Sequence, residues 1–94
     1  METRLFTIVS EFTGITSVMQ VSASGVVEAA EAWAHRLRVD MPFGPSSPGV
    51  AKAVEAGLRT LPPTPIAGVV RVWCLSAVCD DQLCLANIVE TNPA

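Results

Sequence analysis

Residues 72–90 read VWCLSAVCDDQLCLANIVE and consist of two apolar runs on either side of the polar triplet DDQ. Runs rich in valine and other strand-forming residues, bounded by turn-forming residues, are typical of two β-strands that follow each other. Aspartate favours a turn because its side chain can bond to its own backbone. The pattern predicts a β-hairpin over residues 69–90 that turns at residues 80–82.

Both sides of this hairpin carry many apolar residues, since successive strand residues point to opposite sides. One side is expected to carry Val70, Val72, Cys74, Ser76, Val78, Leu83, Leu85, Asn87 and Val89. The other side is expected to carry Arg71, Trp73, Leu75, Ala77, Cys79, Cys84, Ala86, Ile88 and Glu90. Helices packed on the hairpin can cover one side only, and the sequence leaves open which side that is.

Three cysteines, Cys74, Cys79 and Cys84, stand at even five-residue steps in this hairpin. Five steps along a strand span about 16 Å and reverse the direction of the side chain, which separates Cys74 from Cys79. A structural zinc ion needs converging ligands, so we expect no metal site and no cofactor. A four-residue connection would place Cys79 opposite Cys84 and permit a disulfide, whereas a reducing compartment favours free thiols.

Upstream, residues 4–12 (RLFTIVSEF) alternate between apolar and polar side chains, as a strand with one buried side does. The TG dipeptide that follows is suited to a turn, because glycine accepts a positive φ. The next segment, ITSVMQVS, also alternates and returns Met19 and Val21 to the side of Phe6. A first hairpin is therefore predicted over residues 4–22.

A helix is predicted over residues 25–39, between the two hairpins. Ala30, Trp33 and Leu37 recur there at three- and four-residue spacing and so share one side of a helix. Ser24 is a suitable residue to cap the first turn with its hydroxyl group.

A second helix is predicted over residues 48–59, with Ser47 as its cap and Pro48 at the first helical position, where a missing N–H is tolerated. Residues 59–65 (RTLPPTP) follow it and resemble the proline-rich ligands of SH3 domains. We interpret this stretch as a linker, because its prolines are excluded from helices and central strands.

The order of elements is thus ββ-αα-ββ. Two hairpins separated by a helical pair most simply form one α+β domain over residues 1–94, in which both helices pack on one face of a four-stranded antiparallel sheet. The order of the strands within that sheet stays open at this point.

The chain has 94 residues, of which 50% are hydrophobic and only 16% are charged. Soluble domains average roughly a quarter charged residues, so this small chain is expected to expose apolar surface as a monomer. Its net charge is −3 and its six Lys and Arg residues are scattered, which argues against nucleic acid as a partner. No run approaches the ~20 apolar residues that cross a membrane. An odd number of cysteines without a secretion signal predicts a cytoplasmic location.

These features predict a non-enzymatic protein–protein interaction module that forms a dimer through the outer face of its sheet. The interface is expected to contain one of two sets of residues, depending on which side of the second hairpin the helices cover. The sets are Trp73, Leu75 and Ile88, or else Val72, Leu85 and Val89, with Val9 and Val18 extending the contact.

An alternative interpretation is a small acidic protein that binds a basic partner, comparable in size and charge to bacterial immunity proteins. Glu28, Glu31 and Glu55 on the predicted helices would then guide the approach of the partner.

A further alternative is a small-ligand or anion site near residues 41–48, where the second helix offers free N–H groups. His35 and Cys79 are the only residues to nominate for chemistry in that crevice. No sequence pattern brings them together, so no catalytic residue is predicted and the ligand-binding residues stay unassigned.

Overall fold

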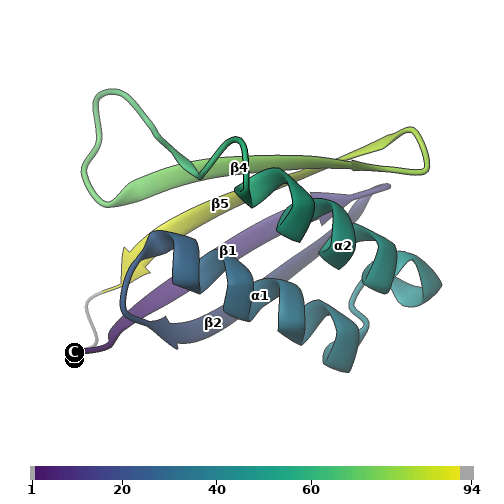
Figure 1. Ribbon diagram of the computed structural model, residues 1–94, viewed down its shortest axis with the longest axis horizontal. Coiled ribbons are helices and arrows are strands. Elements are labelled where there is room, and N and C mark those ends of the chain that lie inside the picture. The colour runs from purple at the N-terminus through teal and green to yellow at the C-terminus, as the bar shows by residue number, and fades with distance from the viewer. Residues whose placement is uncertain (1, 92–94) are drawn as a thin grey trace.

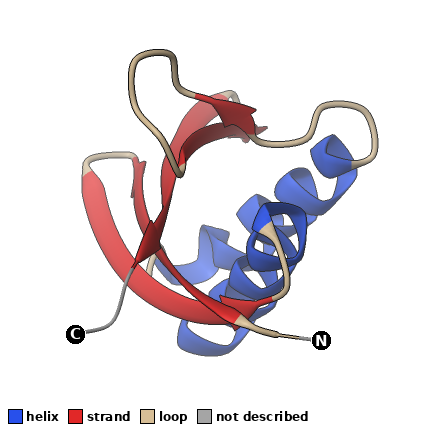
Figure 2. Cartoon of the chain, turned by 90° about the vertical axis from the view of Figure 1, so that its left-hand side faces the viewer, coloured by secondary structure: helices blue, strands red, loops and turns tan. Residues whose placement is uncertain are grey.

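A computed structural model describes residues 2–91. Its elements are β1 (Arg4–Phe12), β2 (Ile15–Ala23), α1 (Val26–Asp40), the short 3-10 helix η1 (Gly44–Ser46), α2 (Ser47–Leu58), β3 (Thr64–Pro65), β4 (Val72–Cys79) and β5 (Gln82–Thr91). The strands form one antiparallel sheet in the order β2-β1-β5-β4-β3. Both helices lie on one face of this curved sheet, and in the described chain no helix covers the other face (Figures 1 and 2).

The predicted α+β class and antiparallel sheet are confirmed, but the predicted count of four strands is wrong. The fifth strand, β3, pairs Thr64 with Cys74 and Pro65 with Trp73 at the edge of the sheet. An edge strand tolerates proline because the missing N–H is not needed by a neighbour. Pro63 is buried, so the proline-rich stretch is part of the fold.

Both hairpins are closed by two-residue turns. Thr13 and Gly14 connect β1 to β2 with φ values of 49° and 82°. Asp80 and Asp81 connect β4 to β5 with φ values of 53° and 61°. Positive φ at both turn residues matches the right-handed twist of the paired strands. The second turn is therefore shorter than predicted, and Gln82 is already the first residue of β5.

The first and last strands of the chain meet in the middle of the sheet. β1 pairs along β5, and Ile8 stands directly opposite Ile88. Both side chains are fully buried between the sheet and the helices, as are Phe6 of β1 and the α1 residues Trp33 and Leu37. Full burial of such a side chain contributes about 1.5–3 kcal/mol to the free energy of folding. The pairing of β1 with β5 thus joins the two hairpins around one core.

The two predicted serine caps are wrong. The N-cap of α1 is Gly25, and no side chain caps that helix. α2 follows directly on η1, so Ser47 is already its first residue and Ser46 occupies the cap position. The Ser47 hydroxyl instead accepts a hydrogen bond from the Phe43 N–H at 2.9 Å. The hydroxyl therefore bonds to the loop that leads into α2, and not to a backbone N–H of the first turn of the helix.

Candidate functional site: the uncovered face of the sheet

The side of the sheet opposite the helices is called here the outer face. Because strand residues alternate in direction, the burial of Phe6 and Ile8 assigns their odd-numbered neighbours in β1 to this face, and the strand register assigns the rest. Its residues are Leu5, Thr7, Val9 and Glu11 in β1; Thr16, Val18, Gln20 and Ser22 in β2; Thr64 in β3; Val72, Cys74, Ser76 and Val78 in β4; and Leu83, Leu85, Asn87, Val89 and Thr91 in β5.

The first predicted set of interface residues lies on the opposite, helix-covered side. Leu75 is 6% exposed and Ile88 is fully buried, so both belong to the core of the protein. Trp73 is half-buried, packs against that core, and its ring lies 6.2 Å from the ring of Phe6. The expectation that these residues form an exposed surface is therefore corrected.

Small side chains on this side of the second hairpin allow α2 to approach the sheet closely. Ala77, Cys84 and Ala86 are all buried there. α2 comes so close that a Cβ atom placed on Gly49 would lie 2.8 Å from the Cys79 Sγ. Bulky side chains at these positions would keep the helix at a distance, whereas the valines and leucines of the other side do not meet it.

The second predicted set lies on the outer face. Leu85 is 52% exposed. Val72 and Val89 stand opposite each other in β4 and β5 and are half-buried. The predicted division of the second hairpin into two sides thus agrees with the burial of its residues, and the packing of the helices leaves this set on the uncovered side.

Five large apolar side chains project from the outer face and are called here the apolar patch: Val9, Val18, Val78, Leu83 and Leu85. Val9 and Val18 stand opposite each other in β1 and β2, and Val78 and Leu83 stand opposite each other beside the second turn. Val18 and Val78 are both 61% exposed. The interface prediction did not name Val78 and Leu83, although the alternation of the hairpin placed both on this side.

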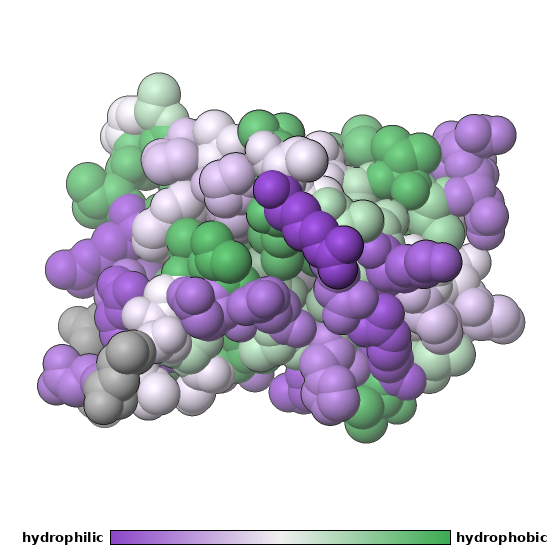
Figure 3. Space-filling model, viewed as in Figure 1, coloured by the Kyte–Doolittle hydropathy of each residue, from purple (hydrophilic) through white to green (hydrophobic). Residues whose placement is uncertain are grey.

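Charge is distributed very unevenly between the two sides of the molecule. Among the strand residues of the outer face, Glu11 is the only charged residue. On the helix side, strongly hydrophilic residues are spread across the surface between smaller hydrophobic areas (Figure 3). On that side Arg36 pairs with Asp40 at 2.6 Å within α1. The outer face therefore lacks the charged cover that normally keeps a sheet face in water.

A hollow of about 350 Å³ opens on the outer face near the hairpin turns. The side chains of Val9, Leu83 and Leu85 contribute apolar walls to it, and Glu11 and Thr16 contribute polar ones. A hollow of this size and lining can receive side chains of a partner surface, because apolar contact on the patch and hydrogen bonds at Glu11 are both available.

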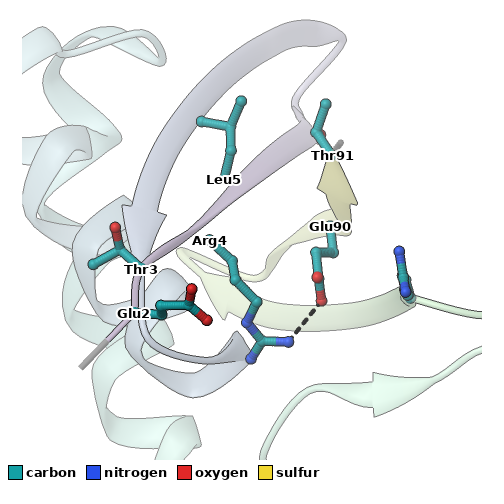
Figure 4. A pocket seen from close by; sticks show the side chains of 7 residues that line it. Glu2, Thr3, Arg4, Leu5, Glu90 and Thr91 are labelled. Atoms are coloured by element: carbon teal, nitrogen blue, oxygen red, sulfur yellow. Dashed lines mark hydrogen bonds and ion pairs between the residues drawn. The ribbon is translucent and has the colours of Figure 1, made fainter. Parts of the chain in front are cut away.

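A second hollow, of about 290 Å³, lies at the other end of the strands, beside Arg4 (Figure 4). The Arg4 guanidinium donates to Glu90 Oε1 at 2.8 Å and to the carbonyl oxygen of Ser24 at 3.0 Å. It also lies over the ring of Phe6, 5.5 Å from the centroid. Arg4 thus ties β1, β5 and the start of α1 together, and its charge is already matched by Glu90.

The cysteines do not form a cluster. The two-residue turn places Cys79 opposite Gln82 and Cys84 opposite Ala77, so the expectation that Cys79 and Cys84 can stand opposite each other is wrong. All three cysteines are free. Burial raises the pKa of the Cys84 thiol to about 11, and burial followed by the nearby Asp80 carboxylate raises the pKa of Cys79. Both thiols are therefore protonated at neutral pH, the opposite of an activated nucleophile.

The other sequence-nominated residues lie apart from the outer face. His35 is exposed on α1. Phe43 anchors the loop of residues 41–48 to the core, with its ring 5.6 Å from that of Phe12. Four hollows of 240 to 350 Å³ in the described chain are all lined by residues outside this loop. Within residues 2–91, no group of three His, Cys, Asp or Glu side chains is placed to hold a metal ion.

The acidic residues of the helices are partly neutralised. Arg38 donates two hydrogen bonds to the Glu55 carboxylate, each 2.7 Å long. This contact lowers the pKa of Glu55. Glu28 and Glu31 are exposed on α1. Of the three carboxylates expected to attract a basic partner, one is already bound by the protein itself.

Comparison with known proteins assigns no family to the chain. No family model, no curated protein and no solved structure matches it. Among the helices of residues 2–91, none is both long enough and apolar enough to span a membrane. The outer face is therefore the feature on which a function can be based.

Proposed function

We propose that this protein is a non-enzymatic interaction module that self-associates through its outer face as a two-fold dimer. The observation that carries the proposal is the apolar patch, exposed on a sheet face with one charged residue. Contiguous apolar surface beyond a few hundred Å² is uncommon on monomers and usually marks an interaction site. Covering such a surface removes its apolar groups from water, and this lowers the free energy.

The composition of the face favours a second copy of the same chain as the occupant. In a two-fold dimer the same surface meets itself, so a face with many like charges repels its copy. Here Glu11 is the only strand residue of the face with a charge. The branched side chains of Val9, Val18 and Leu85 can interdigitate with those of the second sheet, as in the packed sheets of a β-sandwich.

The proposal places the module in the cytoplasm. Cys74 is exposed on the outer face and all three cysteines are free thiols. Exposed thiols persist in a reducing compartment and are readily oxidised outside it.

Two substitutions test the proposal, and each replaces an exposed apolar residue by aspartate. Leu85→Asp places a charge in the apolar patch, whereas Val39→Asp places one at an exposed valine of α1. Light scattering over a range of concentrations is expected to show a larger assembly for the native protein and for Val39→Asp than for Leu85→Asp, which loses the contact through the outer face. Far-UV circular dichroism checks that each variant is folded. A native protein that stays monomeric, or a Leu85→Asp variant that reaches the same assembly size as Val39→Asp, contradicts the proposal.

A further inference from the structure

β2 is an outermost strand of the sheet and one of its two edges. It pairs with β1 over all nine residues, Ile15–Ala23, without a break in register. Among the described residues, no backbone hydrogen bond joins β2 to any segment other than β1. One side of its backbone therefore lacks a strand partner.

The turn determines which backbone groups of β2 face outward. Phe12 and Ile15 flank a two-residue turn, so they form a hydrogen-bonded pair, and such pairs alternate with non-bonded ones along an antiparallel ladder. Every second residue of β2 thus turns its N–H and C=O away from β1. These residues are Thr16, Val18, Gln20 and Ser22.

This edge has none of the features that usually prevent strand pairing. Natural edges are protected by charged side chains, by proline, by bulges or by being very short. β2 contains no proline, no charged residue and no bulge, and it is nine residues long. The opposite edge differs, because β3 has only two residues, ends in Pro65 and pairs with β4 at Trp73 and Cys74 alone. The uncovered remainder of β4, residues 75–79, is five residues long, so β2 is the longer open edge of the sheet.

We propose that β2 pairs antiparallel with β2 of a second copy, so that two five-stranded sheets become one continuous sheet. With the two-fold axis at Met19, Val18 of one copy stands opposite Gln20 of the other, and Thr16 opposite Ser22. The outward groups of both copies then face each other and form about eight hydrogen bonds. The helices of both copies lie on the same side of the joined sheet.

A second copy fits this edge better than an arbitrary strand does, for two reasons. The strand is uncharged from Ile15 to Ala23, so a copy paired with itself brings no like charges together. A two-fold pairing of β2 uses up the longer open edge of each copy, and the ends of the joined sheet carry only β3 and the short uncovered stretch of β4, which favours a closed dimer over an open fibre.

This contact is distinct from the one proposed above. Edge pairing uses the backbone of β2, whereas the proposed face contact uses side chains that project from the sheet. Edge pairing leaves both outer faces on the same side, where they merge into a larger apolar surface. The two contacts are compatible in one assembly, and each is testable without the other.

Amide hydrogen exchange on the native protein, measured residue by residue by NMR, tests edge pairing directly. In a monomer or a purely face-packed dimer, Ser17 and Met19 are protected, while Gln20 and Ser22 exchange rapidly. Edge pairing removes this alternation at concentrations where the protein is associated and restores it on dilution. If the alternation persists in the associated protein, edge pairing is excluded.

A pair of variants at one position gives a second test. Gln20→Pro removes an outward N–H without removing a hydrogen bond to β1. Gln20→Ala is its control, since both variants lose the side-chain bond from Gln20 to Thr7, 3.0 Å long, but the alanine keeps the N–H. Gln20→Pro is expected to raise the dimer dissociation constant about tenfold or more relative to Gln20→Ala.

Two results separate edge pairing from the face contact. Loss of association in Gln20→Pro but not in Leu85→Asp supports edge pairing alone. Loss in Leu85→Asp, with Gln20→Pro as strongly associated as Gln20→Ala, supports the face contact and overturns edge pairing. Should Gln20→Pro fail to fold, the exchange pattern of the native protein still decides the question.

Discussion

Gly49 in α2 and Cys79 in β4 are in such close contact that a Cβ atom on the glycine would lie 2.8 Å from the cysteine Sγ. By contrast, a Cβ atom on Gly57, also in α2, would have no neighbour within 4 Å. The two glycines of α2 therefore have different roles in packing. Gly49 permits the close approach of α2 to the sheet, and Gly57 is a replaceable helix residue.

The first prediction concerns these two glycines. Gly57→Ala is expected to raise the free energy of unfolding by about 0.5–1 kcal/mol, because alanine loses less backbone entropy in a helix. Gly49→Ala is expected to gain less or to destabilise, because Cys79 must move. Gly49→Ala in a Cys79→Ala background removes the obstacle, and a coupling of about 1 kcal/mol is expected in the double-mutant cycle. Urea unfolding measures all four variants, and a coupling near zero contradicts the steric explanation.

A second prediction contrasts the two sides of the second hairpin. Leu75→Ala is expected to lower the free energy of unfolding by about 2–5 kcal/mol, because it leaves a cavity in the core. Leu85→Ala is expected to change the free energy of unfolding of the dilute monomer by about 0.5 kcal/mol or less, because the Leu85 side chain is half exposed. Equal losses in urea unfolding at low protein concentration would show that Leu85 is part of a monomer core.

A third prediction concerns Glu55 and pH. Arg38 lowers the pKa of Glu55 in the folded protein, so the ionised carboxylate favours folding at neutral pH. This contribution is lost as the pH falls through the lowered pKa. Glu55→Gln is therefore expected to melt slightly lower than the native protein at pH 7, with the difference disappearing in acid. Added salt should also reduce it, since both side chains of the pair are partly exposed to solvent. A difference that grows in acid contradicts the assignment.

A fourth prediction concerns the order of thiol modification. In dilute native protein, iodoacetamide is expected to label Cys74 before Cys84, because Cys74 is exposed and Cys84 is buried with a pKa raised to about 11. After unfolding without a reductant, three thiols per chain are expected to react. Peptide mapping by mass spectrometry measures both. Early labelling of Cys84 would indicate that the contact between α2 and the sheet opens easily.

Local patterns determined much of this protein. The alternation in the two hairpins identified which residues share a side of each strand, because strand side chains have a period of two. Helical spacing identified Ala30, Trp33 and Leu37 as the buried side of α1. Less local features were predicted less well: the length of the second turn, the serine caps and β3 each depend on how neighbouring segments meet.

The sequence by itself therefore determined the two faces of the C-terminal hairpin, and only the tertiary structure decided which of them is exposed. That decision depends on contacts between residues far apart in the chain, such as Ile8 with Ile88 and Gly49 with Cys79. The helices settle on the side where small residues allow close packing, which leaves the valines and leucines of the other side uncovered. Alternation along a strand carries no information about this choice, because both faces of the hairpin are apolar.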